Sequence, residues 1–520
     1  MPKLLDTFHF RDNPFASYVA ENEPDIERYF VRPPYFDEVA ARGQACRSMV
    51  LFGARGAGKS ATRLTFYKDC WARRERDEQA PLAIVLDDYS RITSSGLANR
   101  DLGRFVAEVG YLTVEAVLLW LAALEEADRQ LHVETMTADQ ESLVIALVQR
   151  FYLSRPELVR SATVREPLKL LNQAWHKRTK LWLDKRWDAV AGLISTIANA
   201  IVHRASGAES GIDAGLRELL KSDQAQWNDG QFARTLLARF SEFAKVFGFQ
   251  GVVVLVDKVD ETPHTSNSAA ATASLLFPLL STTQLLEIED FGWLFFLWDK
   301  VKESYSATEQ SVRLDKIAHA TIQWQEPFLR SLVGKRLAYF SGDQVSRFED
   351  LCEQSMDANA ALGEIISLCM RSPRELIRVL DTVIREHDEM FSGEEASPRL
   401  VQASIDRALD KYTIETLPRL YARLPLQQIV RMNSVVFTNR DVQKLFRIND
   451  QSARNRIRGW EDAGMIGKTG TRPAEGGQAG KPANEYSIVD QRICRLLQCR
   501  LSLGPEFDMV EEEDAPSEPA

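Results

Sequence analysis

The chain of 520 residues is 45% hydrophobic and 27% charged, as expected for two or three globular domains. Its formal net charge of −10 argues against a surface that binds nucleic acid over its whole area. No signal peptide is visible, Ala189–Val202 is too short to span a bilayer, and the six cysteines lack metal or secreted-domain spacing, so we expect a cytoplasmic protein without a membrane segment.

Residues 1–47 are expected to form an N-terminal brace. Pro33-Pro34 interrupt any continuous helix and predict a helix from about Asp37. Two interpretations of Val31–Pro34 stay open: an extended segment that packs against adenine, or a plain support for the core.

A short apolar strand, Met49–Phe52, leads into the P-loop spacing Gly-x-x-x-x-Gly-Lys-Ser. Glycines keep side chains away from phosphate and allow positive φ, while the helix that follows directs its N–H groups and its dipole at the anion. Lys59 is expected to reach the β- and γ-phosphates of ATP, and Ser60 to bind Mg²⁺. The predicted nucleotide-binding residues are Gly53, Ala54, Arg55, Gly56, Ala57, Gly58, Lys59, Ser60 and Ala61.

Pro81–Asp87 reads as a second buried strand, and residues from about 101 to 247 then turn helical. This stretch is longer than a sheet crossover requires, so it predicts an inserted helical subdomain that could serve a protein partner. Within it, Trp175–Trp187 mixes three tryptophans with basic residues. Two interpretations remain open there: a single-stranded nucleic-acid contact, or a packed helix with a solvated basic face.

The β-branched run Gly251–Asp257 predicts a central strand that delivers Asp257 to the carboxyl edge of a parallel sheet. Beside a P-loop this is the Walker B arrangement, in which Asp257 holds Mg²⁺ directly or through water. Asp260 or Glu261 is expected to orient the attacking water. Lys258 occupies the position where many ATPases carry a catalytic Glu, which leaves the identity of the base open.

Gly292–Asp299 and His319–Trp324 are predicted as the fourth and fifth strands. Asp299 either faces the γ-phosphate or caps its strand. Arg313 either points into a neighbouring subunit's nucleotide or lies on the surface. From Glu326 the pattern is helical, and Arg374, beside Pro373 at a helix start, either reaches back to the phosphates or is a surface residue.

These features together resemble the AAA+ and STAND-type P-loop ATPases. Asp257-Lys-Val-Asp260-Glu261 is similar to the Walker B of NACHT-like members, and Ser372-Pro-Arg374-Glu-Leu to the sensor-2 motif of origin-recognition-type AAA+ proteins. Asn13-Pro-Phe15 and Tyr29–Pro34 resemble a bacterial family of P-loop ATPases of poorly defined role. The resemblance covers about residues 10–390 and implies a helical lid over 326–422.

Residues 425–500 differ in charge from the rest, with 13 Lys+Arg against 7 Asp+Glu, or +6. A capping box at Thr438–Asp441 opens a helix that ends near Phe446, a second helix spans Gln451–Ala463, and strands Met465–Thr469 and Glu485–Ile488 flank a Gly-rich loop. This pattern resembles a winged helix that binds either double-stranded DNA or protein. The predicted DNA contacts are Ser452, Arg454, Asn455, Arg458, Arg472 and Lys481.

The fold class predicted from these elements is α/β: a P-loop NTPase three-layer sandwich over 48–325 with a parallel sheet, a helical insertion, a helical lid, a C-terminal winged helix, and an acidic tail over 505–520 that should be disordered. We expect an ATPase in which Lys59, Asp260, Glu261, Arg313 and Arg374 act in catalysis. Its nucleotide state would set homo-oligomer assembly or DNA binding, in a DNA transaction or in phage defence. The alternative is a non-hydrolysing, nucleotide-gated scaffold.

Overall fold

The structure, a computed structural model, describes residues 4–23, 25–76, 78–94, 96, 101–155, 222–306, 312–392, 397–472, 483–504 and 507. The chain divides into two compact units, one of Glu23–Gln323 and one of Met1–Asn22 with Trp324–Ala520. The predicted N-terminal segment 1–47 is thus divided between the two units, and its first half packs with the later helices. Asn13 Nδ2 donates to Asp381 Oδ1 (2.7 Å), and Arg336 Nε donates to the Pro14 carbonyl (2.6 Å).

A five-stranded parallel sheet forms the centre of the Glu23–Gln323 unit, in the order β2-β3-β4-β1-β5. Four of the strands are almost wholly buried, as expected for a parallel sheet covered on both faces. All five predicted strands are present, although the fifth is shorter than predicted. The strands are Met49–Gly53 (β1), Leu82–Leu86 (β2), Val252–Val256 (β3), Phe291–Trp298 (β4) and His319–Thr321 (β5).

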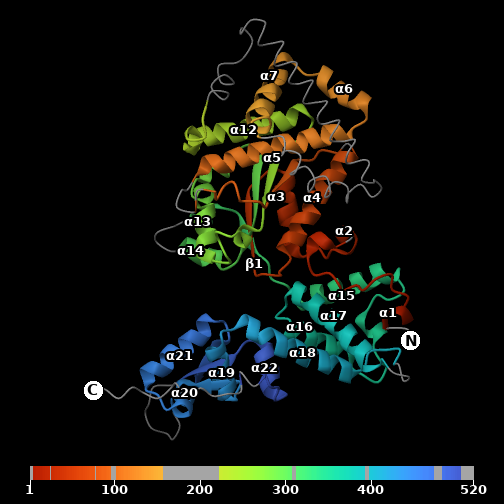
Figure 1. Cartoon of the computed structure of the whole chain (residues 1–520), viewed down its shortest axis with the longest axis vertical. Helices are drawn as coiled ribbons and strands as arrows, with labels where there is room; N and C mark the ends of the chain where they lie inside the picture. The colour runs from red at the N-terminus through yellow and green to blue at the C-terminus, as the bar shows by residue number, and fades with distance from the viewer. Residues whose placement is uncertain are drawn as a thin grey trace. The chain divides into compact units, whose positions relative to one another are not determined.

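Helices cover both faces of this sheet, with α3 and α4 on one side and α13 and α14 on the other (Figure 1). Helix α3 begins at Pro34 rather than at the predicted Asp37, because proline fits the first turn of a helix, where its missing N–H costs nothing. The helices are Ile26–Tyr29 (α2), Pro34–Gln44 (α3), Lys59–Glu75 (α4), Leu102–Ala123 (α5), Glu126–Glu134 (α6), Ala138–Leu147 (α7), Gly230–Val246 (α12), Ala269–Leu280 (α13) and Val301–Ser306 (α14).

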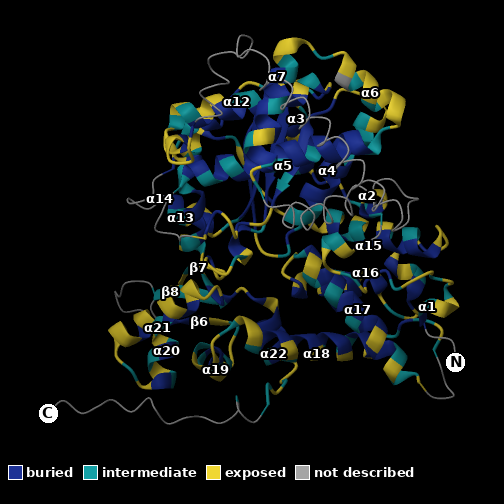
Figure 2. Cartoon of the chain, turned by 45° about the horizontal axis from the view of Figure 1, so that its top comes forward, coloured by how far each residue is buried: buried dark blue, intermediate teal, exposed yellow. Residues whose placement is uncertain are grey.

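The two ends of the predicted helical insertion belong to the layer around the sheet. Helix α5 contacts β2 and α12, and α12 contacts β3 and β4. Among the described residues, α5 is the one helix long and apolar enough to cross a membrane, but 83% of its most apolar window is buried in the structure. Figure 2 shows α5 mostly in the colour of buried residues. The predicted Trp175–Trp187 segment lies outside the described residues.

The other unit is helical up to Leu420 and then changes to a small α/β arrangement. Its first helices are Leu4–Thr7 (α1), Glu326–Ser341 (α15), Ala358–Leu368 (α16), Pro373–Met390 (α17) and Gln402–Leu420 (α18). After them come Arg423–Met432 (α19), Val436–Thr438 (β6), Asn439–Phe446 (α20), Asp450–Asp462 (α21), Ile466–Arg472 (β7), Ala483–Ile488 (β8) and Gln491–Gln498 (α22). The strands form an antiparallel sheet in the order β6-β8-β7.

Helices α20 and α21 lie close to their predicted bounds because local capping determines where they start. Asp441 Oδ2 accepts from the Thr438 backbone N–H (2.7 Å) and hydroxyl (2.8 Å), and Asn449 Oδ1 accepts from Ser452 N–H (2.8 Å). One face of α21, made of Ala453, Ile457 and Trp460, is buried. The third strand, β6, was not predicted.

Candidate functional site

The loop between β1 and α4 curves back on itself at two glycines. Gly56 has φ 78° and Gly58 has φ 90°, both in the left-handed region that favours glycine. Gly53 does not adopt positive φ. A Cβ there would lie 3.0 Å from Ile322 Cδ1, so close packing is what favours glycine at this position. The loop therefore has the backbone shape in which consecutive N–H groups can surround an anion.

Lys59 begins α4 and folds over the loop. Its Nζ donates to the Gly53 carbonyl (2.8 Å) and to the Ala54 carbonyl (3.1 Å). Ser60 follows in the first helical turn and is half-buried. The free N–H groups and the positive dipole end of α4 lie at the same end of the helix as these two residues. A basic side chain, a residue with a hydroxyl and a helix N-terminus thus all occur where the loop joins α4.

Asp257, which directly follows β3, forms a buried ion pair that the sequence did not reveal. Arg63 Nε on α4 donates to Asp257 Oδ2 at 2.8 Å, and the two side chains are 1% and 3% exposed. Asp257 Oδ1 accepts from the Lys258 backbone N–H (2.9 Å). The carboxylate therefore faces α4 one turn beyond Ser60, and a guanidinium compensates its charge.

Tyr89 joins the carboxyl ends of β2 and β3. Its hydroxyl donates to the Leu86 carbonyl (2.8 Å) or the Asp257 carbonyl (2.9 Å). Burial, with the nearby charges of Asp87 and Asp257, raises the pKa of Tyr89 well above its usual value. The phenol therefore stays a neutral donor that holds the Asp257 backbone.

Arg55 leaves the loop and contacts the segment after β3. Its Nε and Nη2 donate to Asp260 Oδ2 at 3.2 and 3.0 Å, and Nη2 also donates to Asn267 Oδ1 at 2.6 Å. The guanidinium carbon lies 4.4 Å from the centroid of the Trp298 ring at the end of β4. The Arg55 side chain is 41% exposed and that of Asp260 12%, so the arginine can be reached from solvent.

The other acids near the loop differ in their surroundings. Glu261 is exposed, whereas Asp260 is buried beside Arg55. Lys258 has φ 58°, and its Nζ lies 4.0 Å from Asp87 Oδ2. Asp299 donates its backbone N–H to the Gly53 carbonyl (3.3 Å) and accepts from Lys300 N–H (2.9 Å), which is the geometry of a strand cap next to the loop.

The two predicted accessory arginines are both exposed. Arg313 is exposed and forms a bidentate pair with Asp315 (2.9 and 2.8 Å). Arg374 is exposed in the first turn of α17, after the N-cap Ser372, in the other unit. Their roles toward a nucleotide stay predictions.

A second candidate site is the exposed face of α21. Arg458 is exposed and has no hydrogen-bond or ion-pair partner within the described ranges. Arg454 is paired with Asp450 (2.8 Å), and Arg472 on β7 is paired across the hairpin with Glu485 (2.8 Å). The predicted contact Lys481 lies outside the described residues.

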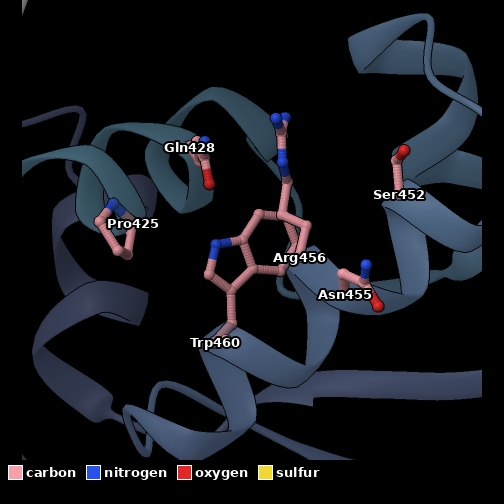
Figure 3. Close-up of a pocket in the computed structure, with 7 residues that line it drawn as sticks. Pro425, Gln428, Ser452, Asn455, Arg456 and Trp460 are labelled. Atoms are coloured by element: carbon pink, nitrogen blue, oxygen red, sulfur yellow. The ribbon is translucent and has the colours of Figure 1, made fainter.

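Ser452 and Asn455, the remaining predicted DNA contacts, are exposed and line a groove between α19 and α21 (Figure 3). Both residues lie on the exposed face of α21, but the groove beside them was not predicted. Helix α19 forms the opposite wall of the groove. The residue pattern of α19 gives no indication in the sequence that this helix packs beside α21.

The described part of the chain contains no group of three or more His, Cys, Asp or Glu side chains that could hold a metal ion. Sequence reasoning missed the side-chain roles of Arg55 and Arg63. Both partners lie about two hundred positions away in the chain, at separations of 205 and 194. For Arg63, the signal in the sequence was a charged residue at a position of the helix that is expected to be buried. For Arg55, it was a charged residue inside a glycine-rich loop.

No protein-family model matches this chain, and no curated protein matches it. The solved structures that are similar to this chain include two that are covered over most of their length. The Aeropyrum pernix ORC1 protein in complex with DNA has 12% identity and a TM-score of 0.34, with 94% of this chain and 96% of that chain covered. The Aeropyrum pernix ORC2 protein in ADPNP-ADP complexes has 9% identity and a TM-score of 0.34, with 94% and 99% covered. These TM-scores are too low to support an argument on fold or function.

Proposed function

We propose that the Glu23–Gln323 unit binds and hydrolyses ATP, and that the other unit presents a winged helix that binds double-stranded DNA. The observation that carries the first part is the loop 53–58, which curves at Gly56 and Gly58 and ends at Lys59 and Ser60 on the first turn of α4. An anion of high charge is the ligand that such a set of donors fits best.

The residues fit a magnesium ion held through water. Ser60 supplies a hydroxyl at the loop, and a carboxylate has about four acceptor positions, of which Asp257 uses one for Arg63 and one for Lys258 N–H. The remaining positions suit acceptance from metal-bound water rather than direct ligation. Bound there, the ion would neutralise charge on the β- and γ-phosphates.

In this proposal Lys59 exchanges the Gly53 and Ala54 carbonyls for phosphate oxygens, which are stronger acceptors. Arg55 likewise exchanges Asp260 for the γ-phosphate. Asp260 is then released to orient the attacking water, next to the loop and shielded from solvent. Glu261, which is exposed, is the second candidate for that role.

Substitutions of Arg55 and Asp260 should therefore change ATP affinity in opposite directions. Arg55→Ala removes a charge-assisted contact, so binding of a non-hydrolysable ATP analogue should weaken about tenfold or more while ADP binding changes little. Asp260→Asn removes the competitor for Arg55, so binding of the analogue should tighten several-fold. Isothermal titration calorimetry on the full chain measures both.

Arg55→Lys is the conservative control and should restore part of the preference for ATP over ADP, since it keeps the charge but not the planar fork. If both Arg55→Ala and Asp260→Asn weaken binding of the analogue, the ion pair between Arg55 and Asp260 has a structural role. Arg55 then does not exchange Asp260 for the γ-phosphate. A wild-type chain that binds neither nucleotide contradicts the proposed function itself.

The proposal that this unit binds DNA rests on two features. The first is the order of α20, the turn between α20 and α21, α21 and the β7–β8 hairpin, and the second is the local charge of +6 over residues 425–500. Arg458 is exposed and has no partner among the described residues, whereas Arg454 and Arg472 are each paired with an acid, so Arg458 should contribute most of the three. Helix α22 ties this module to the preceding helices, because Arg495 pairs with Asp410 (2.8 Å) and Glu364 (2.5 Å).

Arg458→Ala should weaken duplex binding about tenfold and lower the slope of log affinity against log salt by about 1, as expected for a lost phosphate contact. Arg454→Ala should have a smaller effect, because its charge is already compensated by Asp450. Fluorescence anisotropy over a salt series measures both variants. Equal, negligible effects of the two substitutions would favour a protein partner for this module.

A second candidate function is a non-hydrolysing, nucleotide-gated scaffold. The observations that favour it are Lys258 in place of an acid directly after Asp257 and the engagement of Asp260 by Arg55. In that case ATP binds and sets assembly, but no phosphate is released.

A further inference from the structure

The groove between α19 and α21 is a largely open surface groove with a volume of about 360 Å³. Pro425 and Gln428 form one wall, and Asn455, Arg456 and Trp460 form the other. Figure 3 shows the indole nitrogen of Trp460 on the side of the ring that faces Pro425 and Gln428. A Cβ at Gly459 would meet nothing within 4 Å, so the groove is open at that position.

Trp460 carries a donor that its surroundings do not satisfy. The residue is 1% exposed, and its Nε1 has no hydrogen-bond partner among the described residues. A buried N–H without an acceptor is unfavourable, and nearly all such groups in folded proteins find one. Trp460 lines the groove, so an occupant that displaces neighbouring side chains can bring a carbonyl or carboxylate oxygen to this buried donor.

The chain itself supplies a candidate occupant beside the groove. Phe507 packs against the core formed around α20 and α21, and its carbonyl accepts from Gln427 Nε2 on α19 (3.1 Å). Gln427 directly precedes Gln428 of the groove wall. Residues 508–520 follow Phe507 directly in the sequence, and 13 residues span up to about 43 Å when extended.

The composition of residues 508–520 matches this surface. The segment contains six acidic residues and no Lys or Arg, and Met509-Val510 precede the run Glu511–Asp514. The middle of α21 carries three arginines, Arg454, Arg456 and Arg458, with no acid between Asp450 and Glu461. Asp450, Glu461 and Asp462 lie at the two ends of the helix, and Arg431 on α19 lies over Phe446, as does Arg456.

We propose that residues 508–514 bind in the α19–α21 groove. Met509 and Val510 pack against Pro425 and Trp460, a backbone carbonyl accepts from Trp460 Nε1, and Glu511–Asp514 lie along Arg456 and Arg458. The occupied face is the one assigned above to DNA phosphates, so the segment and a duplex exclude each other. The proposal that residues 508–514 bind in the groove does not depend on DNA binding. The competition with a duplex does rest on the proposed DNA binding.

The strength of the competition depends on the covalent link between residues 508–514 and the rest of the chain. A short linker gives an effective concentration of order 1 mM, so a segment that binds in trans with a Kd of about 0.1 mM fills about nine tenths of the grooves in cis. Duplex binding by the full chain should then be about tenfold weaker than binding by a chain that ends at Phe507.

The test compares the full chain, the chain ending at Phe507, and a full-length variant with Glu511, Glu512 and Glu513 changed to Gln and Asp514 to Asn. Duplex affinity is measured by anisotropy, and binding of a labelled peptide of residues 508–520 is measured on the shortened chain. The shortened and neutralised chains should both bind duplex about tenfold more tightly than the full chain. Gly459→Leu, which fills the open part of the groove, should abolish peptide binding without lowering the melting temperature.

Peptide binding that Gly459→Leu abolishes supports the docking even if no chain binds DNA, an outcome that contradicts only the proposed DNA reader. Absence of peptide binding, with equal duplex affinities for all three chains, overturns the docking. A dimer of the shortened chain that Gly459→Leu dissociates, with no peptide binding, also overturns it and assigns the groove to a second copy of the chain.

Discussion

Lys59→Ala should weaken ATP binding at least a hundredfold and remove any hydrolysis. In the structure the Lys59 ammonium donates to the Gly53 and Ala54 carbonyls, 2.8 and 3.1 Å away, and in the proposed function it exchanges both for phosphate oxygens. Loss of charge-assisted hydrogen bonds to two phosphates costs about 3 kcal/mol or more, which corresponds to this factor. Calorimetric titration with ATP measures the affinity.

Lys316→Ala is the matched control, because Lys316 is an exposed lysine of the same unit and should leave ATP affinity unchanged. The melting temperature of Lys59→Ala should also stay near the wild-type value, since Lys59 is only half-buried at the start of its helix. A Lys59→Ala chain that binds ATP as tightly as the wild type contradicts the assignment of the loop.

Arg63→Met should destabilise the Glu23–Gln323 unit by about 3–5 kcal/mol, because it leaves the Asp257 carboxylate charged, buried and unpaired. When Arg63→Met is combined with Asp257→Leu, much of the lost stability should be recovered, because an apolar pair of similar volume replaces a buried ion pair at little net cost. Urea unfolding measures the free energies of the single and double variants. The change should appear in one of the two transitions expected for a chain of two units.

Arg73→Met is the control on the same helix. Arg73 pairs with Asp69 at 3.0 Å, but the side chains are 39% and 32% exposed, so the loss should stay below about 1 kcal/mol. An Arg63→Met chain as stable as Arg73→Met would show that the Asp257 carboxylate finds other partners or water.

The parts of this fold that the sequence predicted are those encoded locally. The strand–loop–helix around Lys59, the apolar run before Asp257, and the caps at Thr438 and Asn449 each lie within a few residues of the signal that reveals them. Spacing and residue type are sufficient there, because the backbone conformation depends on neighbours in the chain.

The missed features are contacts between distant positions. Arg55 meets Asp260 and Arg63 meets Asp257 across about two hundred residues, and Asn13 meets Asp381 across 368. The three-residue strand β6 is similarly set by its pairing with β8 rather than by a pattern of its own. The local periodicity of the sequence does not indicate pairs of residues that are so far apart. For the same reason, the division of the predicted N-terminal brace between two units was not predicted.

The most direct test of the account is steady-state phosphate release from ATP by the full chain, with and without duplex DNA, beside Lys59→Ala. We predict turnover by the wild type that changes when DNA is added and is absent in the variant. Tight ATP binding by the wild type without phosphate release under either condition would contradict the hydrolytic function and identify the nucleotide-gated scaffold instead.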